Sequence, residues 1–328
     1  MVPLVDASRP DQRFPRGMRT IPLQLWYPTA SSEGGQSLYV TDPELLDALK
    51  AGSSKPEVVE SWRNVRTHAI ENGRAKDGAF PLITFSPGFG MARAYYTSWV
   101  EELASHGFVI AVVDHPFAGE TRIDGKGFSP TPHPHGPLGQ TASMAADLRL
   151  VITALADEQF VDGNRIAAVG HSIGGAAAID ASTSDQRIVA SVNLDGDPSF
   201  GNFTHADVRR PFLVIHQKPV FRDAKPDGQP YKIGRELEAT WQAIVARQSN
   251  PTLRLSVWGT THFSFTDALF LRADMLQEGS SEVTDPLEVL HGTTRVIVDY
   301  LRNVFGGQAG VRQPLPSFIT PAKLGEPN

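Results

Sequence analysis

Short apolar segments and segments with a helical spacing alternate along the chain from Phe80 onward. The short apolar segments predict strands, at residues 81–85, 108–113, 166–169, 188–194, 211–216 and 253–258. Apolar residues that recur every three or four positions predict helices, around residues 96–103, 144–155, 237–245 and 297–304, and an Ala-rich helix follows residue 172. Apolar strands with helices between them are typical of a parallel sheet covered on both faces. The pattern therefore predicts an α/β fold.

The chain before Phe80 has a different pattern. Residues 21–27 alternate apolar and polar positions, which predicts an early strand, and Pro22 suits that strand to a sheet edge. Residues 30–79 are largely polar with two short helical stretches. We interpret them as a lid-like insertion, with an ordinary surface excursion as the alternative.

Two further segments interrupt or follow the alternation. Residues 116–139 are rich in Pro, Gly and His and predict a second loop insertion. The last predicted helix is expected to end at Gly306–Gly307, which leaves a Pro/Gly-rich tail over residues 306–328. We see no internal repeat. The sequence therefore predicts a single domain over residues 1–305.

Composition narrows the class of protein. Of the 328 residues, 41% are hydrophobic and 20% are charged, which is the balance of a soluble globular protein. A net charge of −6 provides no basic surface for nucleic acid, and we expect no such partner. The absence of cysteine excludes disulfides and thiolate catalysis, and no apolar run is long enough to span a membrane.

The amino-terminal residues lack the basic and then apolar pattern of an export signal. We therefore expect a cytoplasmic protein, or a secreted or periplasmic one whose signal has been trimmed. The sequence does not set the oligomeric state.

The segment Gly170-His171-Ser172-Ile173-Gly174 follows a predicted strand and opens a predicted helix. In that context a G-x-S-x-G sequence predicts a nucleophile elbow, a sharp turn that exposes the serine Oγ. Small residues on either side let neighbouring backbone approach the strained turn. The amino terminus of the helix directs N–H groups toward a developing oxyanion. We predict Ser172 as the nucleophile, and a serine that only caps the helix is the alternative.

An acyl-transfer site also needs an N–H donor from the loop after an earlier strand. The segment Phe85-Ser86-Pro87-Gly88-Phe89-Gly90 occupies that place. Glycines on both sides of Phe89 would let its N–H turn toward the substrate, while its ring lines the acyl pocket. We predict the N–H groups of Phe89 and Ile173 as the oxyanion hole, and a simple Pro-Gly turn is the alternative.

The general base is expected to come last in the order nucleophile, acid, base. The competing histidines after Ser172 are His205, His216, His262 and His291. The first lies in a loop soon after the nearest carboxylates, the second ends an earlier strand, and the last falls within a helical segment. His262 follows Gly-Thr-Thr directly after the strand over 253–258, where a loop can carry its imidazole back over Ser172. We predict His262 as the base.

Four carboxylates compete for the role of the acid. In many proteins of this architecture it follows the penultimate strand, which would point to Asp223 or Asp227. Here the strand over 188–194 ends directly in Asp195-Gly196-Asp197, and a carboxylate at a strand end is held more rigidly than one in a loop. We place Asp195 first, Asp197 second and Asp223 third.

Two other clusters attract attention. His133-Pro134-His135 could be a metal pair, but the prolines around it and the lack of partner carboxylates favour a solvated loop, so we predict no metal. Asp114-His115 ends a predicted strand at the same edge of the sheet and could line the pocket. The pair precedes Ser172, so it does not fit the expected order of acid and base.

With these residues placed, the chain resembles the plasma-type platelet-activating factor acetylhydrolases and their bacterial relatives, a branch of the α/β-hydrolases. The resemblance runs from about Phe80 to Phe265. It rests on the segment 85–90, Leu103-Ala104-Ser105-His106-Gly107-Phe108-Val109, the elbow at 170–175, the strand end at Asp195, and Thr261-His262-Phe263. The chain departs from the family at Pro87, where a histidine is usual.

The resemblance implies an α/β-hydrolase fold with a mostly parallel central sheet. In that family the acid follows the strand after the nucleophile helix, which favours Asp195 over Asp223. Its oxyanion donors correspond to Phe89 and Ile173. The family hydrolyses esters, often with short or oxidised acyl groups, without a metal or an organic cofactor.

We therefore predict a carboxylic ester hydrolase, esterase-like or lipase-like, that favours short acyl chains and acts through an acyl-enzyme on a small-molecule ester or lipid. Gly88, His171 and Phe263 are candidates for the substrate pocket, although packing suits His171 better than catalysis. The alternatives are the same triad acting on an amide, a thioester or a polyester, and a catalytically silent binding protein. The presence of all three triad residues argues against the silent protein.

Overall fold

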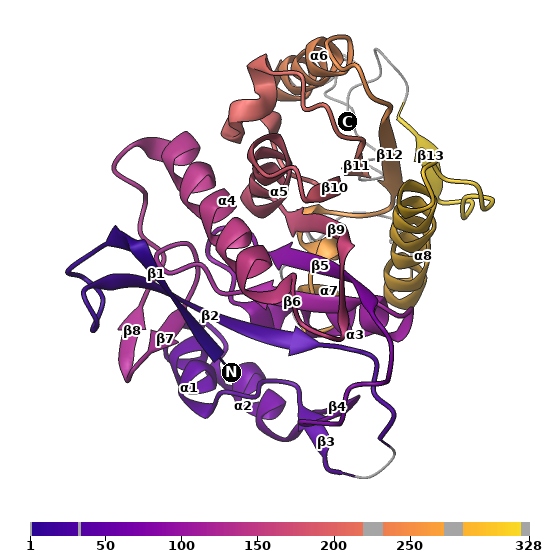
Figure 1. Cartoon of the computed structure of the whole chain (residues 1–328). Helices are drawn as coiled ribbons and strands as arrows, with labels where there is room; N and C mark the ends of the chain where they lie inside the picture. The colour runs from indigo at the N-terminus through magenta and orange to yellow at the C-terminus, as the bar shows by residue number, and fades with distance from the viewer. Residues whose placement is uncertain (1, 32–33, 219–231, 272–284, 323–328) are drawn as a thin grey trace.

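A computed structural model describes residues 2–31, 34–218, 232–271 and 285–322 (Figure 1). Its centre is a nine-stranded sheet with the order β1-β2-β6-β5-β9-β10-β11-β12-β13. The strands of this sheet are β1 (Val2–Pro10), β2 (Met18–Trp26), β5 (Phe80–Ser86), β6 (Val109–Val113), β9 (Val161–His171), β10 (Ile188–Leu194), β11 (Phe212–Lys218), β12 (Thr252–Trp258) and β13 (Ile319–Pro321). The six from β6 to β12 pair in parallel, and β1, β2 and β13 add antiparallel edges.

Helices cover both faces of this sheet (Figure 1). The long helices are α3 (Thr97–Ser105), α4 (Gly136–Leu155), α5 (Ile173–Ser184), α6 (Lys232–Val245) and α8 (Pro286–Phe305). Alternate residues of each parallel strand point to opposite faces. On β5, Ile83 and Phe85 therefore pack with α3 and α8, whereas Leu82 packs with α4 and α5. This two-sided burial explains why the strands are apolar at nearly every position.

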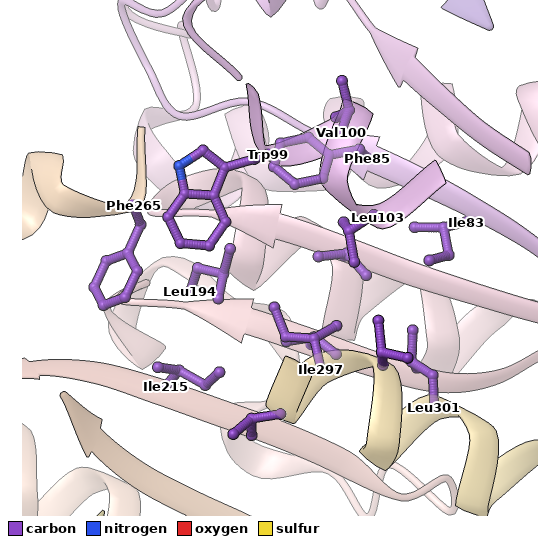
Figure 2. Close-up of a cluster of buried hydrophobic side chains, with 14 of the residues drawn as sticks. Ile83, Phe85, Trp99, Val100, Leu103, Leu194, Ile215, Phe265, Ile297 and Leu301 are labelled. Atoms are coloured by element: carbon purple, nitrogen blue, oxygen red, sulfur yellow. The ribbon is translucent and has the colours of Figure 1, made fainter. Parts of the chain in front are cut away.

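Figure 2 shows the core on the α3 and α8 side of the sheet. Trp99 of α3 and Ile297 of α8 meet there over the strands, together with Phe265 from the loop after β12. The ring centroids of Trp99 and Phe265 lie 6.2 Å apart. Because Phe265 is fully buried, it anchors the loop that carries His262 to the core.

Helix α8 begins and ends at clear sequence signals. The side chain of Asp285 accepts hydrogen bonds from the N–H groups of Leu287 and Glu288, and Pro286 occupies the first turn. A cap of this kind stabilises a helix by about 1 kcal/mol. The helix ends at Gly306, and Gly307 follows with a φ of 76°, a conformation that glycine adopts without strain.

Smaller elements surround the sheet. They are η1 (Trp62–Asn64), η2 (Arg93–Tyr96), η3 (Pro198–Phe200), η4 (Asn202–His205), η5 (His262–Phe265), α1 (Pro43–Gly52), α2 (Pro56–Ser61), α7 (Ala268–Leu271), the two-stranded antiparallel sheet of β3 (Gln36–Leu38) and β4 (Arg66–Ile70), and the hairpin of β7 (Thr121–Ile123) and β8 (Lys126–Phe128). The insertion over 30–79 therefore contains α1, α2 and the β3–β4 sheet. It has a small core of its own around Trp62, which packs against Ala92 and Ala94 beside η2.

The α/β fold and the parallel strands were predicted from the sequence, but four expectations about the flanks were wrong. The early strand that contains Pro22 was expected at a sheet edge, but β2 lies between β1 and β6. The segment 116–139 contains the β7–β8 hairpin and the start of α4, so it is not a plain loop. Strand β1 lies in a stretch for which we predicted no element. The segment after residue 306 returns to the sheet as β13, which pairs with β12, and a Cβ on Gly292 of α8 would collide with the ring of Phe318 just before it. Strand β13 has only three residues, one of them a proline, which are too few to show a period of two.

Candidate active site

The turn between β9 and α5 has the backbone of a nucleophile elbow. Ser172 has a φ of 57° and a ψ of −131°, which only a strongly constrained residue adopts. Its N–H donates to the carbonyl of Leu194 at 2.8 Å. A Cβ on Gly174 would collide with the carbonyl oxygens of Ser86 and Pro87, so glycine is needed where these backbones meet. The turn thus presents Ser172 at the carboxyl ends of the parallel strands.

Three predicted residues meet at this edge of the sheet. His262 Nε2 lies 3.0 Å from Ser172 Oγ, and His262 Nδ1 lies 2.6 Å from Asp195 Oδ2. Ser172 follows β9, Asp195 follows β10 and His262 follows β12. These strands run parallel in the sheet, β9 next to β10, with β11 between β10 and β12. An ionised carboxylate only accepts hydrogen bonds, so Nδ1 of His262 carries the proton and Nε2 accepts from Ser172. This is the arrangement in which an imidazole can take the proton of a serine hydroxyl.

Asp195 is held from two sides. Its Oδ1 accepts the N–H of Gln217 at 3.0 Å, and its own N–H donates to the carbonyl of Ile215 at 2.8 Å. It also has a positive φ of 54°. Its side chain is only 10% exposed, so the carboxylate is fixed against His262 and not free in solvent.

The loop that carries His262 is braced at both ends. Gly259 has a φ of 71° and donates its N–H to the carbonyl of Lys218 at 2.9 Å. Thr261 and Ser264 form a capping box at the start of η5, and Phe265 enters the core. The imidazole of His262 is therefore positioned although its side chain remains 36% exposed.

The segment 85–90 lies directly against the elbow. A Cβ on Gly88 would lie 3.1 Å from Cβ of Ser172. The N–H of Gly88 donates to Tyr96 Oη at 3.0 Å, and the N–H of Gly90 donates to the carbonyl of Ala118 at 2.6 Å. Phe89 lies between them and is 43% exposed. Its N–H and that of Ile173 donate to no other group among the described residues, so both remain available to a ligand oxygen.

His171 is buried and engaged on both ring nitrogens. Its Nε2 donates to the carbonyl of His262 at 2.9 Å, and its Nδ1 accepts from Tyr96 Oη at 2.8 Å. Burial, and then the nearby His262, hold the pKa of His171 well below its usual value, so the ring is neutral. His171 is only 1% exposed, so its ring packs inside the protein, as the sequence analysis favoured for this residue. It connects the segment 85–90 to the loop of His262.

The two other pocket candidates differ from each other. Gly88 is buried behind Ser172, where its lack of a side chain permits the close approach. Phe263 is half-buried and lies beside the His262 ring at a centroid distance of 5.6 Å. Of the two, only Phe263 has a side chain that can contact a substrate.

The competing histidines lie elsewhere. His216 is buried and accepts from Arg254 Nε at 3.2 Å; burial, and then Arg254, lower its pKa to about 3. His291 on α8 lies 3.1 Å from Glu102, and His205 is exposed in η4.

The competing acids do not face His262. Asp197 caps η3 and accepts from the N–H and the hydroxyl of Ser199 at 2.8 and 2.7 Å. Asp223 and Asp227 lie outside the described residues. Only Asp195 among the candidates that the structure describes contacts the His262 ring.

Asp114 and His115 are buried, at 2% and 3% exposure, so the expectation that they line the pocket is wrong. His115 instead hydrogen bonds to Ser86 and to Asp147. No sequence motif connects these residues, because they come from β5, the end of β6 and α4. The only signal was the position of Asp114-His115 after a strand.

A cavity of about 580 Å³ lies apart from this site. It is bordered by β2, the β3–β4 sheet and α3, and Ser172, Asp195 and His262 do not line it. Within the described parts of the chain, no three His, Asp or Glu side chains are grouped to hold a metal ion, and no helix is long and apolar enough to cross a membrane.

The sequence of this chain is similar to those of known protein families. The model of the alpha/beta hydrolase family matches residues 85–311, and that described as platelet-activating factor acetylhydrolase, isoform II, matches residues 10–118. The platelet-activating factor acetylhydrolase of Cavia porcellus is 26% identical over 290 residues, which are 76% of this chain and 64% of that protein. Cutinase 2 of Thermobifida cellulosilytica is 26% identical over 199 residues, 57% of this chain and 70% of the cutinase.

The fold is shared as well. A ferulic acid esterase from Streptomyces cinnamoneus superposes with a TM-score of 0.81 at 27% identity, covering 98% of this chain and 95% of the esterase. The chain spans less than two thirds of the first acetylhydrolases that it matches, 64% of that of Cavia porcellus and 54% of that of Bos taurus. The predicted fold and the resemblance to platelet-activating factor acetylhydrolases are confirmed, and the chain belongs to the alpha/beta hydrolase family.

Proposed function

We propose that the chain is a serine hydrolase that cleaves carboxylic esters through an acyl-enzyme. The hydrogen-bonded row Ser172–His262–Asp195 carries the proposal, because it lies at the carboxyl ends of the strands on a strained and partly exposed turn. The names of the relatives, acetylhydrolase, cutinase and ferulic acid esterase, point to the same bond.

Each residue has a defined role in this reaction. Ser172 Oγ attacks the ester carbonyl carbon while its proton passes to His262 Nε2, and Asp195 stabilises the imidazolium. The N–H groups of Phe89 and Ile173 hold the oxyanion; one such donor is worth roughly a hundredfold to a thousandfold in kcat. The bond to the alcohol oxygen then breaks, and the alcohol leaves with the proton from His262. Water then attacks the acyl carbon while His262 takes one of its protons. The bond between that carbon and Ser172 Oγ breaks, Ser172 regains the proton from His262, and the carboxylic acid leaves.

We further propose a preference for short acyl groups. Phe89 directly follows Gly88, which lies against Ser172, and the ring of Phe263 lies 5.6 Å from that of His262. We propose that these two aromatic side chains limit the depth of the acyl pocket. A small-molecule ester or lipid with a short acyl group suits this opening. No metal or cofactor enters any step.

A labelling experiment and a substrate series test both parts. A fluorophosphonate probe should modify Ser172, identified by peptide mass spectrometry, in the wild type and not in Ser172→Ala. Rates on p-nitrophenyl acetate, butyrate, octanoate and laurate should fall with length, and a chelator should not change them. A probe that leaves Ser172 unmodified would contradict the nucleophile, and rates that rise with length would contradict the acyl preference alone.

A further inference from the structure

A second Ser–His–Asp row lies behind the proposed active site. His115 Nε2 is 2.9 Å from Ser86 Oγ, and His115 Nδ1 is 2.9 Å from Asp147 Oδ2. The same atoms face one another as in Ser172–His262–Asp195. The two rows differ in what surrounds them.

The charge of this second row is fixed by arginines. Arg19 donates two hydrogen bonds to Asp147, at 2.8 and 2.5 Å, and Arg9 Nη1 lies 2.7 Å from the same carboxylate. Asp147 is therefore ionised and accepts from Nδ1–H of His115. Burial lowers the pKa of His115 despite this carboxylate, so the ring is neutral and its Nε2 accepts from the hydroxyl of Ser86.

No substrate can reach this row. Ser86 and Asp147 are 0% exposed and His115 is 3% exposed. Ser86 is also the last residue of a regular strand and not part of a strained turn. Its hydroxyl cannot act as a nucleophile on an external ester, so the row requires another explanation.

The place of Ser86 in the chain supplies one. It is followed directly by Pro87, Gly88 and Phe89, the segment that presents the proposed oxyanion donor. The carbonyl oxygens of Ser86 and Pro87 lie against Gly174, next to the second proposed donor, Ile173. A shift of Ser86 would therefore move one donor relative to the other.

The other end of the same segment is held by the neighbouring residue. Asp114 accepts the N–H of Arg93 at 3.0 Å, and it forms a buried ion pair with the guanidinium of Arg93. Between the ends, the N–H of Gly90 donates to the carbonyl of Ala118, and the N–H of Ala118 donates to the carbonyl of His115. Two adjacent residues after β6 thus contact both ends of the segment 86–93.

We propose that His115, backed by Asp147 and Arg19, is a positioning residue that sets the oxyanion loop through Ser86, while Asp114 holds the far end of that loop through Arg93. The inference rests on the proposed function, because it concerns the donors of the same site. His115 touches neither the substrate nor Ser172. It acts by fixing the position of the Phe89 N–H. A displacement of about 1 Å in a reacting geometry can cost roughly a hundredfold in rate.

Ser86→Ala is the first test, with Ser182→Ala as its matched control. Ser182 is likewise a buried serine whose hydroxyl donates a hydrogen bond, in its case to the carbonyl of Ile179 at 2.7 Å within α5. For Ser86→Ala we expect kcat on p-nitrophenyl butyrate to fall roughly tenfold to a hundredfold with KM nearly unchanged. The Ki of an alkyl boronic acid, whose tetrahedral adduct with Ser172 uses the oxyanion donors, should rise by a similar factor. Ser182→Ala should change neither quantity.

Two variants of His115 separate positioning from bulk stability. In His115→Gln the side-chain amide reaches the position of Nε2, where it can accept a hydrogen bond from Ser86. In His115→Asn the shorter amide reaches the position of Nδ1, where it can only donate a hydrogen bond to Asp147. We expect His115→Gln to retain more kcat than His115→Asn, even where His115→Asn has the higher Tm. In both variants the pKa that kcat/KM reports for the base should stay as in the wild type, because His262 is untouched.

The outcomes distinguish this inference from the function on which it rests. A wild-type enzyme that hydrolyses esters, with Ser86→Ala within twofold of its kcat and boronate Ki, would overturn the positioning role alone. So would a kcat for His115→Asn equal to or above that of His115→Gln. A wild type that neither hydrolyses esters nor reacts with a fluorophosphonate would overturn both proposals.

Discussion

The rows Ser172–His262–Asp195 and Ser86–His115–Asp147 share their hydrogen-bond order and nearly their distances. Their surroundings are opposite. The first lies on a turn with a positive φ at the serine and with its imidazole partly exposed, whereas the second is buried between β5, α4 and the arginines of β1 and β2.

The difference shows that three side chains in line do not by themselves make a nucleophile. Ser172 is partly exposed and lies on a turn that also presents the N–H of Ile173. Ser86 has a strand before it and packed side chains around it. Loss of a residue should therefore affect mainly turnover in the first row, and mainly loop position and stability in the second.

The largest expected effect is on the first serine and its base. Ser172→Ala and His262→Ala should each lower kcat by several orders of magnitude, and the double variant should lose little more, because nucleophile and base act as a unit. The measurement is the turnover number on one short-chain ester with protein of matched Tm. Retention of most activity in either single variant would remove the distinction between the rows.

The acid should follow with a smaller loss. Asp195→Asn keeps the size of the side chain but favours the wrong imidazole tautomer, so kcat should fall by roughly a thousandfold or more. Asp197→Asn serves as the control, since Asp197 caps η3, and Asp223→Asn tests the remaining candidate. Both should stay close to wild-type turnover; a large loss in Asp223→Asn with a small one in Asp195→Asn would move the acid to the other position.

The matching change in the buried row should act on folding instead. Asp147→Asn leaves Arg19 buried without a full counter-charge, and breaking a buried pair of this kind costs about 3–5 kcal/mol. Tm should therefore drop clearly, whereas Asp195→Asn should leave it nearly unchanged. Thermal unfolding of both variants at pH 7 provides the measurement, and equal Tm values would refute the contrast.

The pH dependence of this effect has a definite sign. Burial acts to raise the pKa of Asp147, but Arg19 and His115 hold it well below its usual range. A depressed folded-state pKa stabilises the protein above the unfolded value, and that contribution is lost as the pH falls below about 4. The Tm difference between wild type and Asp147→Asn should accordingly shrink in acid.

A buried carboxyl without arginines provides the opposite case and the smallest effect. Asp267 accepts from Tyr39 Oη at 2.8 Å and from the N–H of Ser98 at 3.0 Å, and burial, only partly offset by these bonds, raises its pKa to about 7. The folded protein then holds an extra proton between about pH 4 and pH 7, so its stability falls as the pH rises through that window. Relative to wild type, Asp267→Asn should gain roughly 2 °C or more in Tm between pH 5 and pH 8. A difference that does not vary with pH would contradict this.

Much of the fold could be predicted because its information is local. Each parallel strand is apolar on both faces, and each covering helix shows a stripe, so the alternation from Phe80 onward is visible without any tertiary knowledge. The edge strands were missed for the same reason. Strand β1 has no distinct period, and β13 is three residues long with a proline at its end. Neither strand is therefore marked by its own residues, and each is defined by its pairing in the sheet.

The candidate site also has residues that could be predicted from the local sequence and residues that could not. Ser172 is marked by its own neighbours, and His262 and Asp195 by their order along the chain and their places after strands. The hydrogen bonds of His171 and the burial of His115 could not be predicted, because they depend on Tyr96, on Asp147 and on arginines of β1 and β2. Their hydrogen bonds exist only once these elements pack together.

Strand β13 determines where the chain can be truncated or joined to a tag. It covers β12 through the pairing of Leu255 to Val257 with Ile319 to Pro321, and the N–H of Trp258 donates to the carbonyl of Phe318 at 2.8 Å. A truncated chain that ends at residue 306 would leave the backbone N–H and C=O groups along one edge of β12 unpaired and exposed. Such an edge invites pairing with a second copy, and the truncated protein should tend to form insoluble aggregates. An affinity tag should therefore be attached beyond residue 322, and it should not replace the residues of β13.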